Sequence, residues 1–200
     1  MQSSEEVNIT IESNYIYFDG KENNKALIFY QGAKVDNIAY SRLMYELAEN
    51  GIDCFLLNVP YRFALLGLNM PDKIINNYNY EEWYIGGHSL GGVVASMYAS
   101  NHNNINGLIL LASYPCALLN DNIKVISIYG SNDKVLDKTS YNNAVWPLHT
   151  QEYIIEGGNH SGFGNYGEQK GDGKALISNT LQQDETIEII VNELFSEISN

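Results

Sequence analysis

The fold of this chain is decided by one stretch of its sequence, Trp83-Tyr84-Ile85-Gly86-Gly87-His88-Ser89-Leu90-Gly91-Gly92-Val93-Val94-Ala95-Ser96. An apolar run typical of a buried strand (83–85) passes through the pattern G-x-S-x-G into a segment with helical periodicity (93–100). Such a sharp turn needs small residues two before and two after the serine, and Gly87 and Gly91 meet that need. A glycine-rich turn that binds phosphate at a helix N-terminus is the alternative. Ser89 is therefore a candidate nucleophile.

Short apolar runs lie on both sides of this stretch and are separated mostly by segments with helical periodicity. This order is typical of buried parallel strands joined by crossover helices. Residues 7–12 and 14–18 instead alternate polar and apolar positions, which indicates an antiparallel hairpin at the edge of the sheet. We therefore predict one α/β domain over residues 1–200, with a mostly parallel twisted sheet and helices on both faces. The expected strands are 26–30, 52–57, 83–85, 108–112, 125–129 and 153–155, and the expected helices are 40–48, 93–100 and 185–198.

Charge and motif content narrow the possible partners. The 200 residues contain 11 Lys plus Arg and 24 Asp plus Glu, a net charge of −13, which repels nucleic acid and anionic membrane surfaces. The sequence has no metal-ligand cluster, Walker loop or dinucleotide fingerprint, so we expect neither a metal nor a cofactor. Nothing in the pattern indicates an oligomeric state.

The expected location follows from the apolar runs, which are too short to span a bilayer, and from residues 1–10, which lack the profile of a signal peptide. We expect a cytoplasmic protein. The alternative is an anchored or exported one whose N-terminal segment has been removed.

A nucleophilic serine needs a base, and the base needs an acidic partner that fixes its tautomer. Asp133 follows the predicted strand 125–129 through a polar turn, the position expected of the acid. His160 follows the predicted strand 153–155 through two glycines, the position expected of the base. Asp121 and His149 precede their strands and so lie at the opposite edge of a parallel sheet. The other candidates, Asp137, His88 and His102, fit less well.

The negative charge that forms on a substrate oxygen during acyl transfer needs hydrogen-bond donors already in place. One should be the backbone N–H of Leu90, directly after the nucleophile. We expect the second to be the N–H of Ala33, with Lys34 next in line, in the turn that Gly32 allows after the predicted strand 26–30. An ordinary strand-to-helix turn is the alternative reading of that segment.

Four motifs together resemble the bacterial α/β-hydrolase fold-5 family, which is related to the dienelactone hydrolases: Tyr30-Gln31-Gly32-Ala33-Lys34-Val35, Gly86-Gly87-His88-Ser89-Leu90-Gly91-Gly92, Ile128-Tyr129-Gly130-Ser131-Asn132-Asp133 and Glu156-Gly157-Gly158-Asn159-His160. The resemblance implies an α/β-hydrolase fold, a triad of Ser89, Asp133 and His160, and an oxyanion hole at Leu90 and Ala33. Dienelactone hydrolases proper carry a cysteine where this chain has Ser89, so their substrate is not carried over.

The expected activity is hydrolysis of a small carboxylic ester through an acyl-enzyme. A thioesterase or amidase on the same triad, and a non-catalytic binding protein on this fold, are the alternatives. Only residues 113–124 join the predicted strands 108–112 and 125–129, too few for a large helical cap, so we expect a shallow site and short acyl chains. We expect residues 162–173 to form a loop that acts as a lid or a substrate wall. The alternative is a solvated or purely structural loop. The expected substrate contacts are Arg62, Tyr114 and Phe163.

Overall fold

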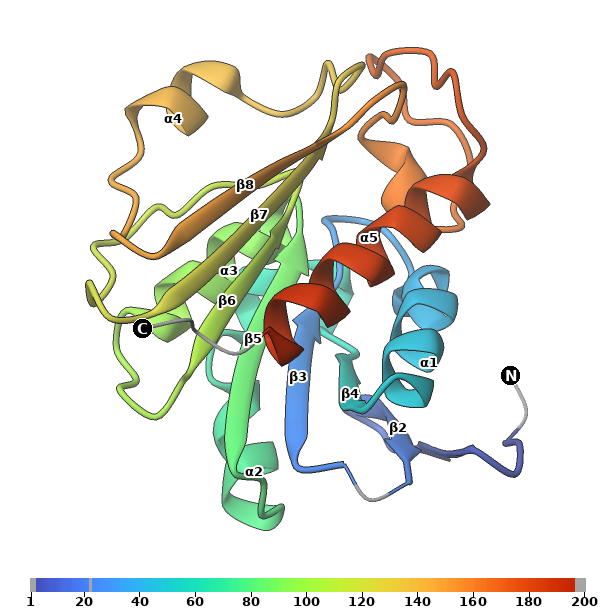
Figure 1. The fold of residues 1–200 in the computed structure, drawn as a ribbon, viewed down its shortest axis with the longest axis vertical. Helices are drawn as coiled ribbons and strands as arrows, with labels where there is room; N and C mark the ends of the chain where they lie inside the picture. The colour runs from blue at the N-terminus through green and yellow to red at the C-terminus, as the bar shows by residue number, and fades with distance from the viewer. Residues whose placement is uncertain (1–2, 22, 197–200) are drawn as a thin grey trace.

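The computed structural model describes residues 3–21 and 23–196, which form one eight-stranded sheet in the order β1-β2-β4-β3-β5-β6-β7-β8 (Figure 1). The first two strands pair antiparallel with each other, and β2 also pairs antiparallel with β4, whereas the remaining neighbours are parallel. The predicted mostly parallel sheet with an antiparallel N-terminal hairpin is therefore confirmed. The strands are β1 (Val7–Ile11), β2 (Tyr15–Gly20), β3 (Lys25–Tyr30), β4 (Ile52–Leu57), β5 (Glu82–His88), β6 (Gly107–Leu111), β7 (Lys124–Gly130) and β8 (Thr150–Ile155).

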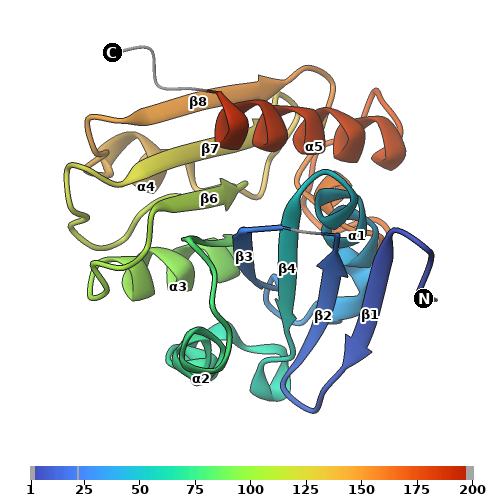
Figure 2. The ribbon, with the colours of Figure 1, turned by 60° about the horizontal axis from the view of Figure 1, so that its bottom comes forward.

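Helices cover both faces of the sheet because the central strands are apolar on both sides. Helices α1 (Ser41–Glu49) and α5 (Asn179–Phe195) pack on one face, and α2 (Met70–Asn77) and α3 (Leu90–Ala99) pack on the other (Figure 2). Along β3, Leu27 and Phe29 belong to the first core, whereas Ala26, Ile28 and Tyr30 belong to the second. This double burial explains why the strands appear in the sequence as unbroken apolar runs.

The order of the strands reverses direction at β3. The chain runs from β3 through α1 to β4 on one side, and then through α2 to β5 on the other side. In open α/β sheets such a reversal leaves a crevice at the carboxyl ends of the strands, where ligands bind. The loops after β3 and β5, which contain Ala33 and Ser89, meet at this crevice.

Some elements differ from the expectations. Helix α5 begins at Asn179, six positions before the predicted start, because Ser178 caps it by accepting a hydrogen bond from the Leu181 N–H at 3.1 Å. Helices α2 and α4 (Lys138–Asn143) were not predicted. The predicted end of the last helix, at residue 198, lies outside the described residues. In the described part of the chain, no helix combines the length and the apolar character needed to cross a membrane.

Candidate active site

Ser89 occupies the sharp turn between β5 and α3. Its φ of 55° and ψ of −125° place it in a strained region of backbone space, as residues at functional sites often are. A Cβ at Gly87 would lie 2.4 Å from the carbonyl carbon of Gly91, and a Cβ at Gly91 would lie 2.4 Å from the carbonyl oxygen of Tyr30. The predicted need for small residues around the serine is therefore confirmed.

Strained residues gather at this edge of the sheet. Among the described residues, the non-glycine residues with positive φ all follow the carboxyl ends of β3, β4, β5 and β6. They are Lys34, Tyr61, Arg62, Ser89 and Ala112. Backbone strain is thus concentrated in the loops around the crevice, as is typical of functional sites.

Asp133 and His160 form a buried pair. Nδ1 of His160 lies 2.9 Å from Oδ2 of Asp133, and their side chains are 1% and 0% exposed. The other carboxylate oxygen accepts hydrogen bonds from the N–H groups of Val135 and Leu136, each at 2.8 Å. Burial would raise the pKa of Asp133, but the bonds from His160 and these two N–H groups hold that pKa below its usual range. The ionised carboxylate can only accept, so Nδ1 of His160 carries the proton and Nε2 is left as an acceptor.

The second ring nitrogen of His160, Nε2, differs from Nδ1 in its surroundings. In the described part of the chain, Nε2 of His160 is buried without a hydrogen-bond partner. Ser89 and His160 line one cavity of about 190 Å³ together with Leu90, Val93, Ala112, Ser113, Tyr114, Val135, Leu136 and Asp137. No direct hydrogen bond joins the Ser89 hydroxyl to Nε2 within these residues, a contact that often tightens only when substrate binds.

The main chain around His160 is fixed by residues that the sequence did not single out. The Asp172 carboxylate accepts from the N–H groups of His160 at 3.2 Å and Ser161 at 2.9 Å. Buried Gln182 of α5 accepts from the N–H of Asn159 and donates to its carbonyl. Asn159 in turn donates to the carbonyl of Gly173 at 2.8 Å. At the other end of the segment 162–173, the N–H of Gly162 donates to the Asn159 side chain at 2.9 Å, so both ends are tied to residues around His160, which favours a structural role over a lid.

The loop after β3 leaves the N–H of Ala33 without an acceptor among the described residues. The N–H of Gly32 donates to the Tyr40 hydroxyl at 3.2 Å, that of Lys34 to the Arg62 carbonyl at 2.9 Å, and that of Val35 to the Gly32 carbonyl at 3.2 Å. Among the described residues, the N–H groups of Ala33 and Leu90 have no such acceptor. This arrangement favours Ala33 over Lys34 as the second oxyanion donor.

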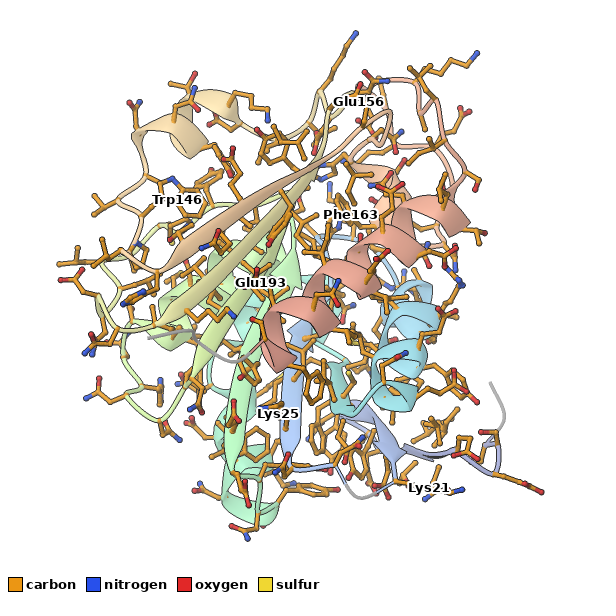
Figure 3. All side chains as sticks on the ribbon, viewed as in Figure 1. Lys21, Lys25, Trp146, Glu156, Phe163 and Glu193 are labelled. Atoms are coloured by element: carbon orange, nitrogen blue, oxygen red, sulfur yellow. The ribbon has the colours of Figure 1, made fainter. Side chains whose placement is uncertain are left out.

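The three expected substrate contacts differ in position. Tyr114 lines the Ser89 cavity, as expected of a contact residue. Arg62 does not line it; its guanidinium pairs with Asp36 at 2.6 Å in an exposed ion pair, and its carbonyl holds the Lys34 N–H. Phe163 is fully buried among the side chains between α5 and the sheet, 5.8 Å from the His88 ring, and does not line the cavity (Figure 3). The structure thus brings together Ser89, Leu90, Tyr114 and His160 around one cavity, with Asp133 bonded to His160, whereas Ala33, Arg62 and Phe163 are not among the residues that line it.

A metal site would need several converging donors. In residues 3–21 and 23–196, no three His, Cys, Asp or Glu side chains are grouped so that they could hold a metal ion.

Comparison with known proteins agrees with this architecture. The Alpha/beta hydrolase family matches residues 26–184, and no curated protein matches the chain. A predicted CIB-like hydrolase from Thermoplasma acidophilum superposes with a TM-score of 0.66 at 14% identity, covering 94% of this chain and 97% of that one. TT1662 from Thermus thermophilus superposes with a TM-score of 0.66 at 12% identity, covering 96% of this chain and 99% of that one. Est1E from Butyrivibrio proteoclasticus superposes with a TM-score of 0.64 at 12% identity, covering 96% of this chain and 100% of that one. A family match over most of the chain, on a sheet of this topology, shows that the protein belongs to the alpha/beta hydrolase family.

Proposed function

We propose that the protein is a serine hydrolase that cleaves small, uncharged carboxylic esters through an acyl-enzyme. One observation carries the proposal: the buried His160 ring is bonded to Asp133 at 2.9 Å, its Nε2 has no partner among the described residues, and His160 lines the same cavity as Ser89, which occupies a strained turn. A nucleophile, a base and an orienting acid are the groups that acyl transfer requires.

In the proposed mechanism, the Ser89 hydroxyl attacks the ester carbonyl carbon while Nε2 of His160 accepts its proton. The N–H groups of Leu90 and Ala33 stabilise the oxyanion, and Asp133 stabilises the imidazolium. As the tetrahedral intermediate collapses, His160 returns the proton to the leaving alcohol, and the acyl group stays on Ser89. Water then attacks the acyl-enzyme by the same route and releases the acid.

The cavity supports a small and uncharged substrate. Its volume of about 190 Å³ lies below the usual range for sites that hold drug-sized ligands. No helix lies between β6 and β7 in the described residues, so no cap closes over it. At its wall, hydrogen bonds from the Ser140 hydroxyl and backbone hold the pKa of Asp137 below its usual range, so this carboxylate stays charged and repels anionic substrates.

The test of the proposal is labelling with a fluorophosphonate followed by peptide mass mapping. We expect one label per chain on Ser89, because only a serine with a base in reach reacts readily. Ser113 is the matched control: it lines the same cavity, but its hydroxyl donates to the Ser89 carbonyl, so Ser113→Ala should still take the label. A folded protein that takes no label, or takes it elsewhere, contradicts the proposal.

Acyl-chain preference depends on Tyr114, which separates the Ser89 cavity from a second one of about 380 Å³ that is lined by uncharged residues including Leu118 and Val145. Each buried methylene contributes about 0.8 kcal/mol, so kcat/KM for p-nitrophenyl esters should rise with chain length only until this wall is reached. We expect the wild type to peak at short acyl chains without interfacial activation. Tyr114→Ala joins the two cavities and should move the peak to longer chains.

Leu148→Ala is the control for that series, because Leu148 is 83% exposed and lines neither cavity. Its profile should match the wild type. A wild-type profile that rises steadily to palmitate would mean that the pocket is deeper than we propose.

A further inference from the structure

A buried chain of hydrogen bonds connects the loop after β3 to the main chain of His160. The N–H of Gly32 lies 3.2 Å from the Tyr40 hydroxyl, that hydroxyl lies 2.8 Å from Nδ1 of His88, and Nε2 of His88 lies 3.0 Å from the His160 carbonyl oxygen. Tyr40 is 0% exposed and His88 and His160 are 1% exposed, so water does not compete for these bonds. The triad itself uses neither Tyr40 nor His88.

The chemistry of the groups fixes where the protons lie. A carbonyl oxygen can only accept, so Nε2 of His88 carries the ring proton and donates it to His160. The neutral ring then accepts at Nδ1, so the Tyr40 hydroxyl donates to it and accepts from Gly32. Burial, with the neighbouring His160, lowers the pKa of His88 well below its usual value, and burial raises that of Tyr40. Both side chains therefore stay neutral, and each bond in the chain keeps one direction.

This chain of hydrogen bonds connects two distant parts of the sheet. The loop after β3 and the loop after β8 belong to strands that β5, β6 and β7 separate, yet two side chains connect them. Gly32 directly precedes Ala33, whose N–H has no acceptor among the described residues, and the accepting carbonyl belongs to His160, the proposed base. A Cβ at Gly32 would lie 2.9 Å from both His88 Nδ1 and the Tyr40 hydroxyl, so the three residues fit only because position 32 is glycine.

We propose that Tyr40 and His88 are positioning residues that hold the oxyanion loop and the catalytic base at a fixed separation. The inference rests on the proposed function, since it concerns the geometry of that same site. The donor and the base must both meet one tetrahedral intermediate, so a small change in their separation weakens binding of the transition state more than binding of the substrate.

Tyr40→Phe tests this by removing one hydroxyl. We expect kcat to fall about 10- to 100-fold, since displacements of about 1 Å can cost that much, while KM changes less than about twofold. Tyr30→Phe is the matched control: Tyr30 is also 0% exposed, but its hydroxyl donates to the carbonyl of Leu68, away from the triad. Tyr30→Phe should keep the wild-type kcat. Equal kcat values for the two variants would overturn the proposal, whatever their stabilities.

His88 provides a second test that does not depend on Tyr40→Phe being folded. Gln can both accept and donate with its amide, whereas Leu can do neither, so His88→Gln should retain more kcat than His88→Leu. In a long-range ¹H–¹⁵N spectrum of the wild type, His88 should show the Nε2–H form and His160 the Nδ1–H form. An Nδ1–H signal from His88, or equal kcat values for the Gln and Leu variants, would contradict the proposed chain.

Ser89→Ala, assayed alongside, separates this inference from the proposed function. Loss of turnover in Ser89→Ala with no change in Tyr40→Phe defeats the positioning role alone. Full turnover in Ser89→Ala defeats the proposed function, and the inference with it.

Discussion

Ser89→Ala and His160→Ala are each expected to lower kcat by roughly 10⁵-fold, and the double variant should be scarcely worse than either. The reason is that the serine is a poor nucleophile without the base, and the base has no proton to accept without the serine. Steady-state kinetics on a p-nitrophenyl ester measures the three losses, with kcat calculated per folded molecule.

His102→Ala is the matched control for the histidine. His102 forms a partly exposed pair with Asp72 at 3.4 Å and follows the C-terminal end of α3, the end opposite to Ser89, so its removal should leave kcat near the wild-type value. Losses at Ser89 and His160 that multiply in the double variant would show that the two residues do not act together, and that one role has been given to the wrong residue.

Asp133→Asn is expected to lower kcat by about 10³- to 10⁴-fold while the fold is kept. The asparagine oxygen can still accept from Val135 and Leu136, so its NH₂ group faces His160. A donor in that position reverses the tautomer of the ring, which puts a proton on Nε2 and stops it from accepting the Ser89 proton. Kinetics on the same ester measures the loss.

Asp137→Asn is the control for this acid. Asp137 also lines the cavity, but its carboxylate caps α4 through the N–H groups of Thr139 and Ser140, which asparagine can also do. Its kcat should stay within a few-fold of the wild type. A large loss in Asp137→Asn with a small one in Asp133→Asn would reassign the acid.

The Asp133→Asn variant also tests how the stability of the fold depends on pH. The pKa of Asp133 is lower in the folded protein than its ordinary value, so its ionised form stabilises the fold above the ordinary carboxyl range, and that contribution is lost as pH falls through the folded pKa. The difference in the free energy of unfolding between wild type and Asp133→Asn should be largest at neutral pH and should shrink below about pH 4. Urea unfolding at several pH values measures it. A difference that stays constant across that range would contradict the depressed pKa.

Much of the site could be predicted from the sequence because it is built from strand ends. Ser89, Asp133 and His160 each follow an apolar run that is buried on both faces, and such runs are the clearest signal a sequence gives. Parallel pairing then brings their carboxyl ends to one edge. The mostly parallel sheet follows from that pattern, and its N-terminal hairpin follows from the alternation of polar and apolar residues before it.

What could not be predicted depends on polar groups buried in non-periodic segments. Gln182 and Gln183 are buried in the first turns of α5, where their side chains bond to the main chain near His160. Polar residues on the buried face of a helix interrupt the apolar pattern from which a helix is predicted, so the predicted start lies too late in the sequence. Asp172 and Tyr40 act through hydrogen bonds to the backbone of His160 and Ser161 and to Gly32 and the His88 ring, groups that only the folded chain brings together. Phe163, expected at the substrate, fills the core, because an aromatic residue close in sequence to the proposed base can face inward as readily as outward.

The strained residues at the carboxyl ends of β3 to β6 set a direction for engineering. Glycine adopts positive φ without the steric penalty that a side chain carries, so changing Tyr61 to glycine would relieve strain in a residue that is otherwise exposed. Selection for heat resistance alone would favour such substitutions at these strained positions. Because the carbonyl of Arg62, the next residue, accepts from the Lys34 N–H in the loop that contains Ala33, we expect a more flexible residue 61 to loosen the proposed oxyanion loop. A screen for thermostable forms of this protein should therefore score turnover together with melting temperature.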